Sequence, residues 1–63
     1  MQMDKYDRSI LAALQEDGRI SNVQLAARVS LSESACLRRV RALEDAGYID
    51  RYVALVNQSR VGL

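Results

Sequence analysis

Residues 21–40 read SNVQLAARVSLSESACLRRV, and this stretch decides the fold. Ser21 and Ser32 each stand before an amphipathic run, and serine is a preferred N-cap because its hydroxyl accepts a hydrogen bond from the first helical turn. Gln24 follows Ser21 by three residues, which is the spacing of a capping box. The first run ends near Val29, so only two residues precede the second cap. The stretch therefore predicts two short helices joined by a very tight turn.

The apolar residues of this helix pair recur at helical spacing and predict a shared core. They are Leu25, Ala26, Val29, Cys36, Val40 and Leu43. Cys36 lies within the second stripe, and the chain has no histidine to activate a thiol, so we interpret it as a small core residue. Gly47 suits the left-handed C′ position that ends many helices, and it marks the expected end of the second helix.

A further helix is expected before this pair, from about Asp4 to Asp17. Asp4 can cap it, because a short carboxylate accepts hydrogen bonds from the unpaired N–H groups of the first turn. Its apolar stripe consists of Tyr6, Ile10, Leu11 and Leu14. Gly18 suits a left-handed C′ position at its end. We interpret Asp7 and Arg8 as surface charges that contribute little to stability.

The segment after Gly47 predicts a β extension. Residues 48–56 alternate in character and are rich in β-branched and aromatic side chains, which is typical of a strand in a wing or hinge ribbon. We interpret Tyr48 and Tyr52 as packing residues. The predicted fold class is therefore mainly α, a three-helix helix-turn-helix domain of winged-helix type with a short C-terminal strand.

Length and composition limit what this chain can be. Its 63 residues form one domain at most, which we place at residues 1–56, with the helix-turn-helix motif at about 21–40 and the start of a hinge at 57–63. The lone Cys36 excludes an internal disulfide and agrees with a reducing compartment. No stretch approaches the roughly 18 apolar residues of a membrane span, and the N-terminus lacks a signal-peptide pattern. We therefore expect a cytoplasmic location.

The absence of histidine removes the commonest general base and metal ligand. The sequence also contains no phosphate-binding loop and no cluster with the spacing of metal ligands. We therefore expect no catalytic residue, no metal site and no cofactor in this domain, and we do not expect an enzyme.

The charge distribution points to a different class of function. The net charge is only +1, yet the 14 residues from Arg28 to Arg41 hold four arginines against one acid, Glu33. The planar guanidinium can donate two parallel hydrogen bonds to guanine in the major groove or to phosphate. Composition alone would favour a solvated face, but the tight turn between two capped helices favours a nucleic-acid interface.

The second helix of the pair would carry the contacts with bases, because one of its faces lies opposite the apolar stripe. The predicted base-edge contacts are Ser32, Ser34, Ala35 and Arg38, with Arg41 as outer support. The predicted phosphate contacts are Arg19, Ser21, Asn22, Arg28, Arg39 and Arg51. The two capped helix N-termini could also offer backbone N–H groups to phosphates.

A protein-interaction module is the alternative, since winged-helix domains can bind protein and the low net charge leaves room for it. Its signature would be an exposed apolar patch on the same helix. That face is polar and basic, with Leu37 at its edge as the exception.

The run DRSILAALQEDGRISNVQLAARVSLSESACLRRVRALEDAGYIDRYVALVN, residues 7–57, closely resembles the N-terminal domain of the leucine-responsive/asparagine-operon (Lrp/AsnC) regulators. The motifs DGRIS at residues 17–21 and CLRRV at residues 36–40 make the resemblance much more specific than a general helix-turn-helix pattern. Three positions depart from the family pattern. Ser30 stands at a common turn glycine, Glu33 at a frequent proline and Arg51 at a common strand glycine.

The resemblance implies a bacterial or archaeal transcription regulator that binds pseudo-palindromic double-stranded DNA. It also implies a homodimer or higher homo-oligomer in the full-length protein. A separate C-terminal domain would bind an amino-acid-type effector, and we expect it to follow the hinge.

Overall fold

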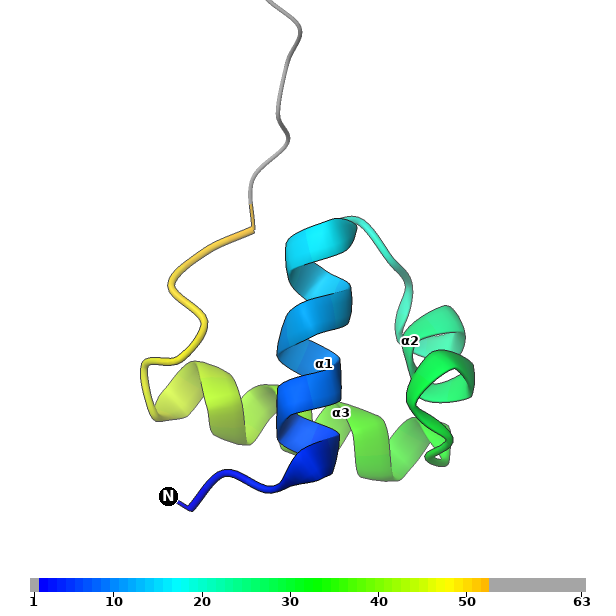
Figure 1. The fold of residues 1–63 in the computed structure, drawn as a ribbon, viewed down its shortest axis with the longest axis horizontal. Coiled ribbons are helices and arrows are strands. Elements are labelled where there is room, and N and C mark those ends of the chain that lie inside the picture. The colour runs from blue at the N-terminus through cyan, green and yellow to red at the C-terminus, as the bar shows by residue number, and fades with distance from the viewer. Residues whose placement is uncertain (1, 53–63) are drawn as a thin grey trace, which may run out of the picture.

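The computed structural model describes residues 2–52, which form three helices. They are α1 (Lys5–Glu16), α2 (Asn22–Val29) and α3 (Glu33–Asp45). Each helix packs against the other two. In Figure 1, α1 crosses in front of α3, and α2 lies to one side of α1 above one end of α3. The three predicted helices are therefore confirmed, with bounds close to those expected from the caps.

The start of α1 is more elaborate than the sequence indicated. Asp4 is the N-cap as predicted, and its Oδ1 accepts a hydrogen bond from the backbone N–H of Asp7 at 3.0 Å. The carboxylate of Asp7 in turn accepts a bond from the N–H of Asp4 at 3.2 Å, which completes a capping box. The interpretation of Asp7 as a surface charge is wrong, because this residue is only 2% exposed. Arg8, its neighbour, is exposed as expected.

The end of α1 also differs from the prediction. Gly18 is not left-handed, since the only positive φ angles in residues 2–52 belong to Ser30 and Gly47. Asp17 ends the helix instead in an extended conformation, φ −146° and ψ 95°. Its N–H donates to the carbonyl of Ala13, and its Oδ1 accepts from the N–H of Arg19 at 3.0 Å. This local aspartate turn reverses the chain without a left-handed residue.

The α2 helix begins and ends through local hydrogen bonds. Ser21 is its N-cap and accepts from the N–H of Gln24 at 3.2 Å. The reciprocal bond, from the backbone N–H of Ser21 to the Gln24 side chain, is not among the hydrogen bonds of residues 2–52, so only half of the predicted capping box forms. Ser30 ends the helix with φ 62° and ψ 43°. The N–H of Leu31 donates to the carbonyl of Ala26 at 2.9 Å, as in a Schellman motif.

The α3 helix follows the predicted start and stop signals. The Ser32 hydroxyl accepts from the N–H of Ala35 at 3.2 Å. At the other end, Gly47 has φ +83°, and the N–H of Tyr48 donates to the carbonyl of Leu43 at 3.0 Å. This second Schellman motif confirms the predicted role of Gly47.

One apolar core joins the three helices. Its buried members are Ile10, Ala13, Leu25, Ala26, Val29, Cys36 and Leu43. Leu14 and Val40 are half-buried and pack against this core, and Tyr6 is half-buried on α1. Cys36 is 0% exposed, and burial raises the pKa of its thiol, because a thiolate would lose its hydration there. The interpretation of Cys36 as a core residue is confirmed.

The chain continues from α3 without forming a helix or strand up to residue 52. The remainder of the strand predicted at 48–56 lies outside the described residues, so the strand stays a prediction. Tyr48 and Tyr52 are 48% and 47% exposed, so packing accounts for only part of each side chain. No helix within residues 2–52 is long and apolar enough to cross a membrane.

We expect Ser30→Gly to stabilise the domain. A left-handed backbone costs an L-residue with a side chain about 1–2 kcal/mol, and glycine escapes most of that cost while losing more entropy on folding. The free energy of unfolding should increase by about 1 kcal/mol, which raises the melting temperature of a domain this small by about 4–8 °C. Thermal unfolding followed by circular dichroism would measure it. An unchanged or lower melting temperature would contradict this expectation. It would show that contacts of the Ser30 side chain stabilise the domain by at least as much as its left-handed backbone destabilises it.

Gly47→Ala is the matched comparison for Ser30→Gly, because it adds a side chain at a left-handed position and should therefore lower the stability of the domain. A Cβ added at Gly47 would meet no atom within 4 Å, so any loss must come from the backbone at φ +83°. We expect this variant to lose about 1 kcal/mol of stability.

Candidate nucleic-acid interface

The outer face of α3 carries the side chains predicted to contact bases. Ser34, Arg38 and Arg41 are exposed, whereas Cys36 and Leu43 on the opposite side are buried. Ala35 is half-buried next to this face. The hydroxyls of Ser32 and Ser34 lie 3.4 Å apart at the start of the helix. The structure therefore brings the five predicted base-contacting residues together on one helix.

The predicted phosphate contacts do not share one environment. Arg39 points to the N-terminus of α1, where its Nη1 lies 2.8 Å and 2.7 Å from the two carboxylate oxygens of Asp4. The same nitrogen is 3.2 Å from Oδ1 of Asp7. The guanidinium carbon also lies 5.2 Å from the centre of the Tyr6 ring, within cation–π range. The Arg39 side chain is thus directed at α1 and is 33% exposed.

Arg28 at the end of α2 is paired as well, with Glu16 at the end of α1. Both side chains are well exposed, so this ion pair contributes little to stability and is screened by salt. Arg28 can therefore exchange Glu16 for another anion at small cost. Its predicted contact with phosphate stays a prediction.

Asn22 joins the two helix starts. Its Nδ2 donates to the carbonyl of Glu33 at 2.9 Å, and its Oδ1 is buried without a hydrogen-bond partner among the described residues. Both polar atoms of the amide are therefore turned towards the protein. This geometry gives Asn22 a structural role that the sequence did not indicate, and its predicted contact with phosphate stays a prediction.

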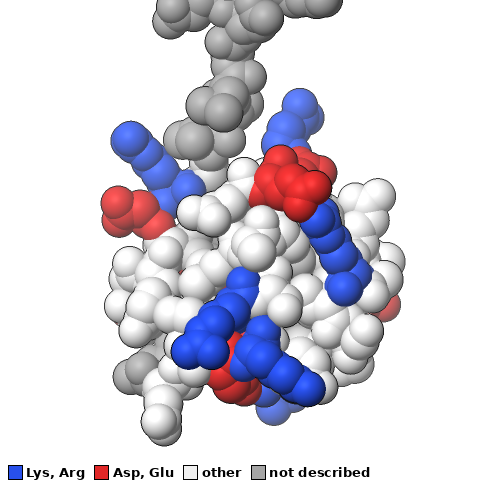
Figure 2. Space-filling model, in the orientation of Figure 1, with Lys and Arg blue, Asp and Glu red and all other residues white. Residues whose placement is uncertain are grey.

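The remaining predicted arginines are exposed: Arg19, Arg38, Arg41 and Arg51. None of them forms a salt bridge within the described range 2–52. Figure 2 shows the face with α1 in front, where basic and acidic side chains lie beside one another. The structure thus divides the arginines into two that the acids of α1 already neutralise and four with no such partner.

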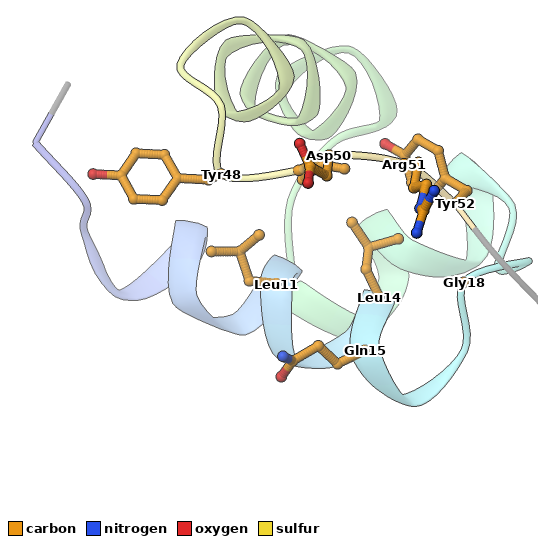
Figure 3. A pocket seen from close by; sticks show the side chains of 9 residues that line it. Leu11, Leu14, Gln15, Gly18, Tyr48, Asp50, Arg51 and Tyr52 are labelled. Atoms are coloured by element: carbon orange, nitrogen blue, oxygen red, sulfur yellow. The ribbon is translucent and has the colours of Figure 1, made fainter.

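A groove between α1 and residues 48–52 was missed by sequence reasoning. It has a volume of about 510 Å³. Figure 3 shows Leu11 and Leu14 projecting from α1 towards the segment that carries Tyr48. The only hint in the sequence was Leu11, which widens the apolar stripe of α1 beyond what two helices cover. No group of three or more potential metal ligands occurs in residues 2–52.

A family model described as winged helix-turn-helix DNA-binding matches residues 3–50. The chain therefore belongs to the winged helix-turn-helix DNA-binding family. Within that class it is similar to the Lrp/AsnC regulators, which confirms the resemblance seen in the sequence.

Individual relatives support this placement. The leucine-responsive regulatory protein of Rhizobium meliloti is 55% identical over 62 residues, which are 98% of this chain and 40% of that protein. The protein of the same name from Escherichia coli is 58% identical over 55 residues, 87% of this chain and 34% of that protein. The present chain thus spans less than half the length of these relatives. They are named as regulators, in agreement with the expectation that this chain is not an enzyme.

Solved structures give the same result. A transcriptional regulator from Neisseria meningitidis, in complex with L-Met, has a TM-score of 0.91 at 52% identity, covering 95% of this chain and 39% of that one. LrpC from B. subtilis has a TM-score of 0.91 at 36% identity, covering 100% of this chain and 45% of that one. An AsnC family regulator from Agrobacterium tumefaciens has a TM-score of 0.87 at 44% identity, covering 94% of this chain and 39% of that one.

The ion pair at the start of α1 should make stability depend on pH in the acid range. The hydrogen bond from Arg39 is the main cause that lowers the pKa of Asp4 from its ordinary value of 3.8 to about 2. Because the folded-state pKa is depressed, this stabilisation is complete above about pH 5 and is lost progressively as the pH falls through 3.8 towards 2. We expect the melting temperatures of the wild type and Arg39→Gln to differ near neutral pH and to converge towards pH 2. A constant difference across this range would contradict the assignment.

Proposed function

We propose that this chain is the DNA-reading part of an Lrp/AsnC-type transcription regulator and that α3 enters the major groove of double-stranded DNA. The observation that carries the proposal is the outer face of α3, where Arg38 and Arg41 are exposed and have no acidic partner within residues 2–52. Membership of a DNA-binding family supports it.

The side chains on this face suit distinct roles. Arg38 would donate a pair of hydrogen bonds to a guanine edge, since a guanidinium matches the two acceptors that guanine presents in the major groove. The small side chains of Ser32, Ser34 and Ala35 would let the start of α3 approach the bases closely. Arg41 would support the complex from the outer part of the helix.

The phosphate contacts would surround this reading face. Arg19, Arg28 and Arg51 are exposed and can move towards a DNA backbone. Ser21 lies at the start of α2, where the helix dipole favours an anion. Such contacts hold the protein on the duplex and carry no sequence information of their own.

The whole regulator would be larger than this chain. We place the DNA-binding domain at residues 1–56, including a wing or hinge strand at 48–56, and the start of a hinge at 57–63. A C-terminal domain for an amino-acid-type effector would follow, in line with the complex between the Neisseria regulator and L-Met. We expect a cytoplasmic homodimer or higher homo-oligomer, in which two copies of α3 read half-sites about 34 Å apart.

A titration of the domain against duplex DNA at several salt concentrations tests this function. Affinity should fall steeply with salt and should differ between sequences. Arg38→Ala should weaken binding to the preferred sequence by about 1–3 kcal/mol and relax the sequence preference. Arg8→Ala is a suitable control, because Arg8 is exposed on α1 and forms no salt bridge within residues 2–52.

Two outcomes would contradict the proposal. If Arg38→Ala and Arg8→Ala behave alike, α3 is not the reading helix. If the folded domain, also as a forced dimer, binds no duplex at low salt, the alternative of a protein-interaction module is favoured. Leu37 on α3, which is 38% exposed, would then be the first residue to examine.

A further inference from the structure

We infer that Arg39 is a positioning residue, which clamps α3 to the start of α1 and so orients the reading face, and that it does not bind phosphate. This inference rests on the proposed function, and it revises the role that the sequence suggested for Arg39. The two roles, positioning and phosphate contact, predict different dependences of DNA affinity on salt concentration, so an experiment can separate them.

The geometry of the clamp engages several groups at once. One guanidinium nitrogen of Arg39 lies within 3.2 Å of three carboxylate oxygens that belong to Asp4 and Asp7. The guanidinium also lies over the ring of Tyr6, so three side chains of α1 and its cap hold a single side chain of α3. Arg39 is separated in the chain from Asp4 by 35 positions and from Asp7 by 32. The contacts therefore fix one helix against the other.

Asp7 makes this clamp costly to open. Its side chain is 3% exposed, and each carboxylate oxygen has one partner, the Asp4 N–H for Oδ2 and Arg39 for Oδ1. If Arg39 moved to a phosphate, the buried carboxylate of Asp7 would lose the only cationic partner that it has within residues 2–52. The exposed pair between Arg28 and Glu16 contains no such buried acid, so Arg28 is the more available of the two arginines.

The position of Arg39 on α3 explains how the clamp acts on the site. Arg38 is its neighbour in sequence, and successive residues on a helix are rotated by about 100°. Holding the Arg39 side chain on the flank that faces α1 therefore acts together with the burial of Cys36 and Leu43 to set the rotation of α3 about its axis. That rotation decides where Arg38 and Arg41 point.

Comparison of Arg39→Gln with Arg38→Gln separates positioning from phosphate contact. Each variant removes one positive charge from α3. The proposal expects Arg39→Gln to lower the melting temperature by several degrees and to weaken binding several-fold at every salt concentration, with an unchanged slope of log K against log salt. A phosphate contact would instead reduce that slope by about 0.9 with no loss of stability. That result for Arg39→Gln would overturn the proposal. Arg38→Gln should leave the melting temperature unchanged.

Asp4→Asn tests the clamp from the other helix and leaves α3 intact. Asparagine is as good an N-cap as aspartate, so the start of α1 is preserved. The ion pair between Arg39 and Asp4 is lost, whereas the one between Arg39 and Asp7 is left in place. Removal of an acid would raise DNA affinity if only net charge mattered, because the protein becomes more positive. The clamp predicts the opposite sign, a several-fold loss of affinity in a domain that is still folded. Equal or higher affinity would overturn the positioning role.

Failure of the proposed function would give a different pattern. If the wild type binds no duplex at any salt concentration, the DNA-reading function fails. The clamp can then be tested by a double-mutant cycle of Arg39→Gln and Asp7→Asn, in which urea unfolding measures the free energy of unfolding of each variant. Additive losses of stability would overturn the clamp, whereas a double variant that is hardly less stable than either single variant would support it.

Discussion

The arrangement of α2 and α3 depends on the left-handed backbone of Ser30. Because α2 ends at this one residue, the chain reverses at once and Ser32 can begin α3 beside the helix it has just left. The bond from Asn22 to the carbonyl of Glu33 then joins the two helix starts. With α2 and α1 packed on one side of α3, the side opposite Cys36 remains uncovered, and this is the side that carries the exposed arginines. The tight turn at Ser30 thus brings α2 against α3, and packing on the Cys36 side leaves the opposite face of α3 exposed to solvent.

The sequence predicted those parts of the fold that local chemistry decides. Ser21, Ser32 and Gly47 mark helix ends through hydrogen bonds to residues three to five positions away, so their roles can be read from spacing alone. The apolar stripes likewise predicted the core, because helical periodicity places Cys36 and Leu43 on one face. The outer face of α3 followed from the same periodicity. For this reason the predicted base-contacting residues lie together in the structure.

The errors have two physical sources. Gly18 was expected to be left-handed because it follows a helix, but Asp17 can end that helix with its own side chain, and spacing does not decide between these two local solutions. Asp7 was misjudged because its burial accompanies a contact with Arg39, a partner more than 30 positions away. Asp7 stands next to Arg8 in the sequence, and this pair of charges gave no indication that Asp7 is buried. The groove beside α1 depends on the path of residues 48–52, which no local pattern specifies.

The buried carboxylate of Asp7 also has a consequence for how such a chain can evolve. The stability that Asp7 contributes depends on Arg39, so a substitution at either position changes the effect of a substitution at the other, although they lie on different helices. A lineage that loses the arginine first carries an unpaired buried acid, whereas one that first replaces the acid by a neutral side chain retains a tolerable, partly exposed arginine. Substitution at this pair therefore has a preferred order, in which Asp7 on α1 changes before Arg39 on α3.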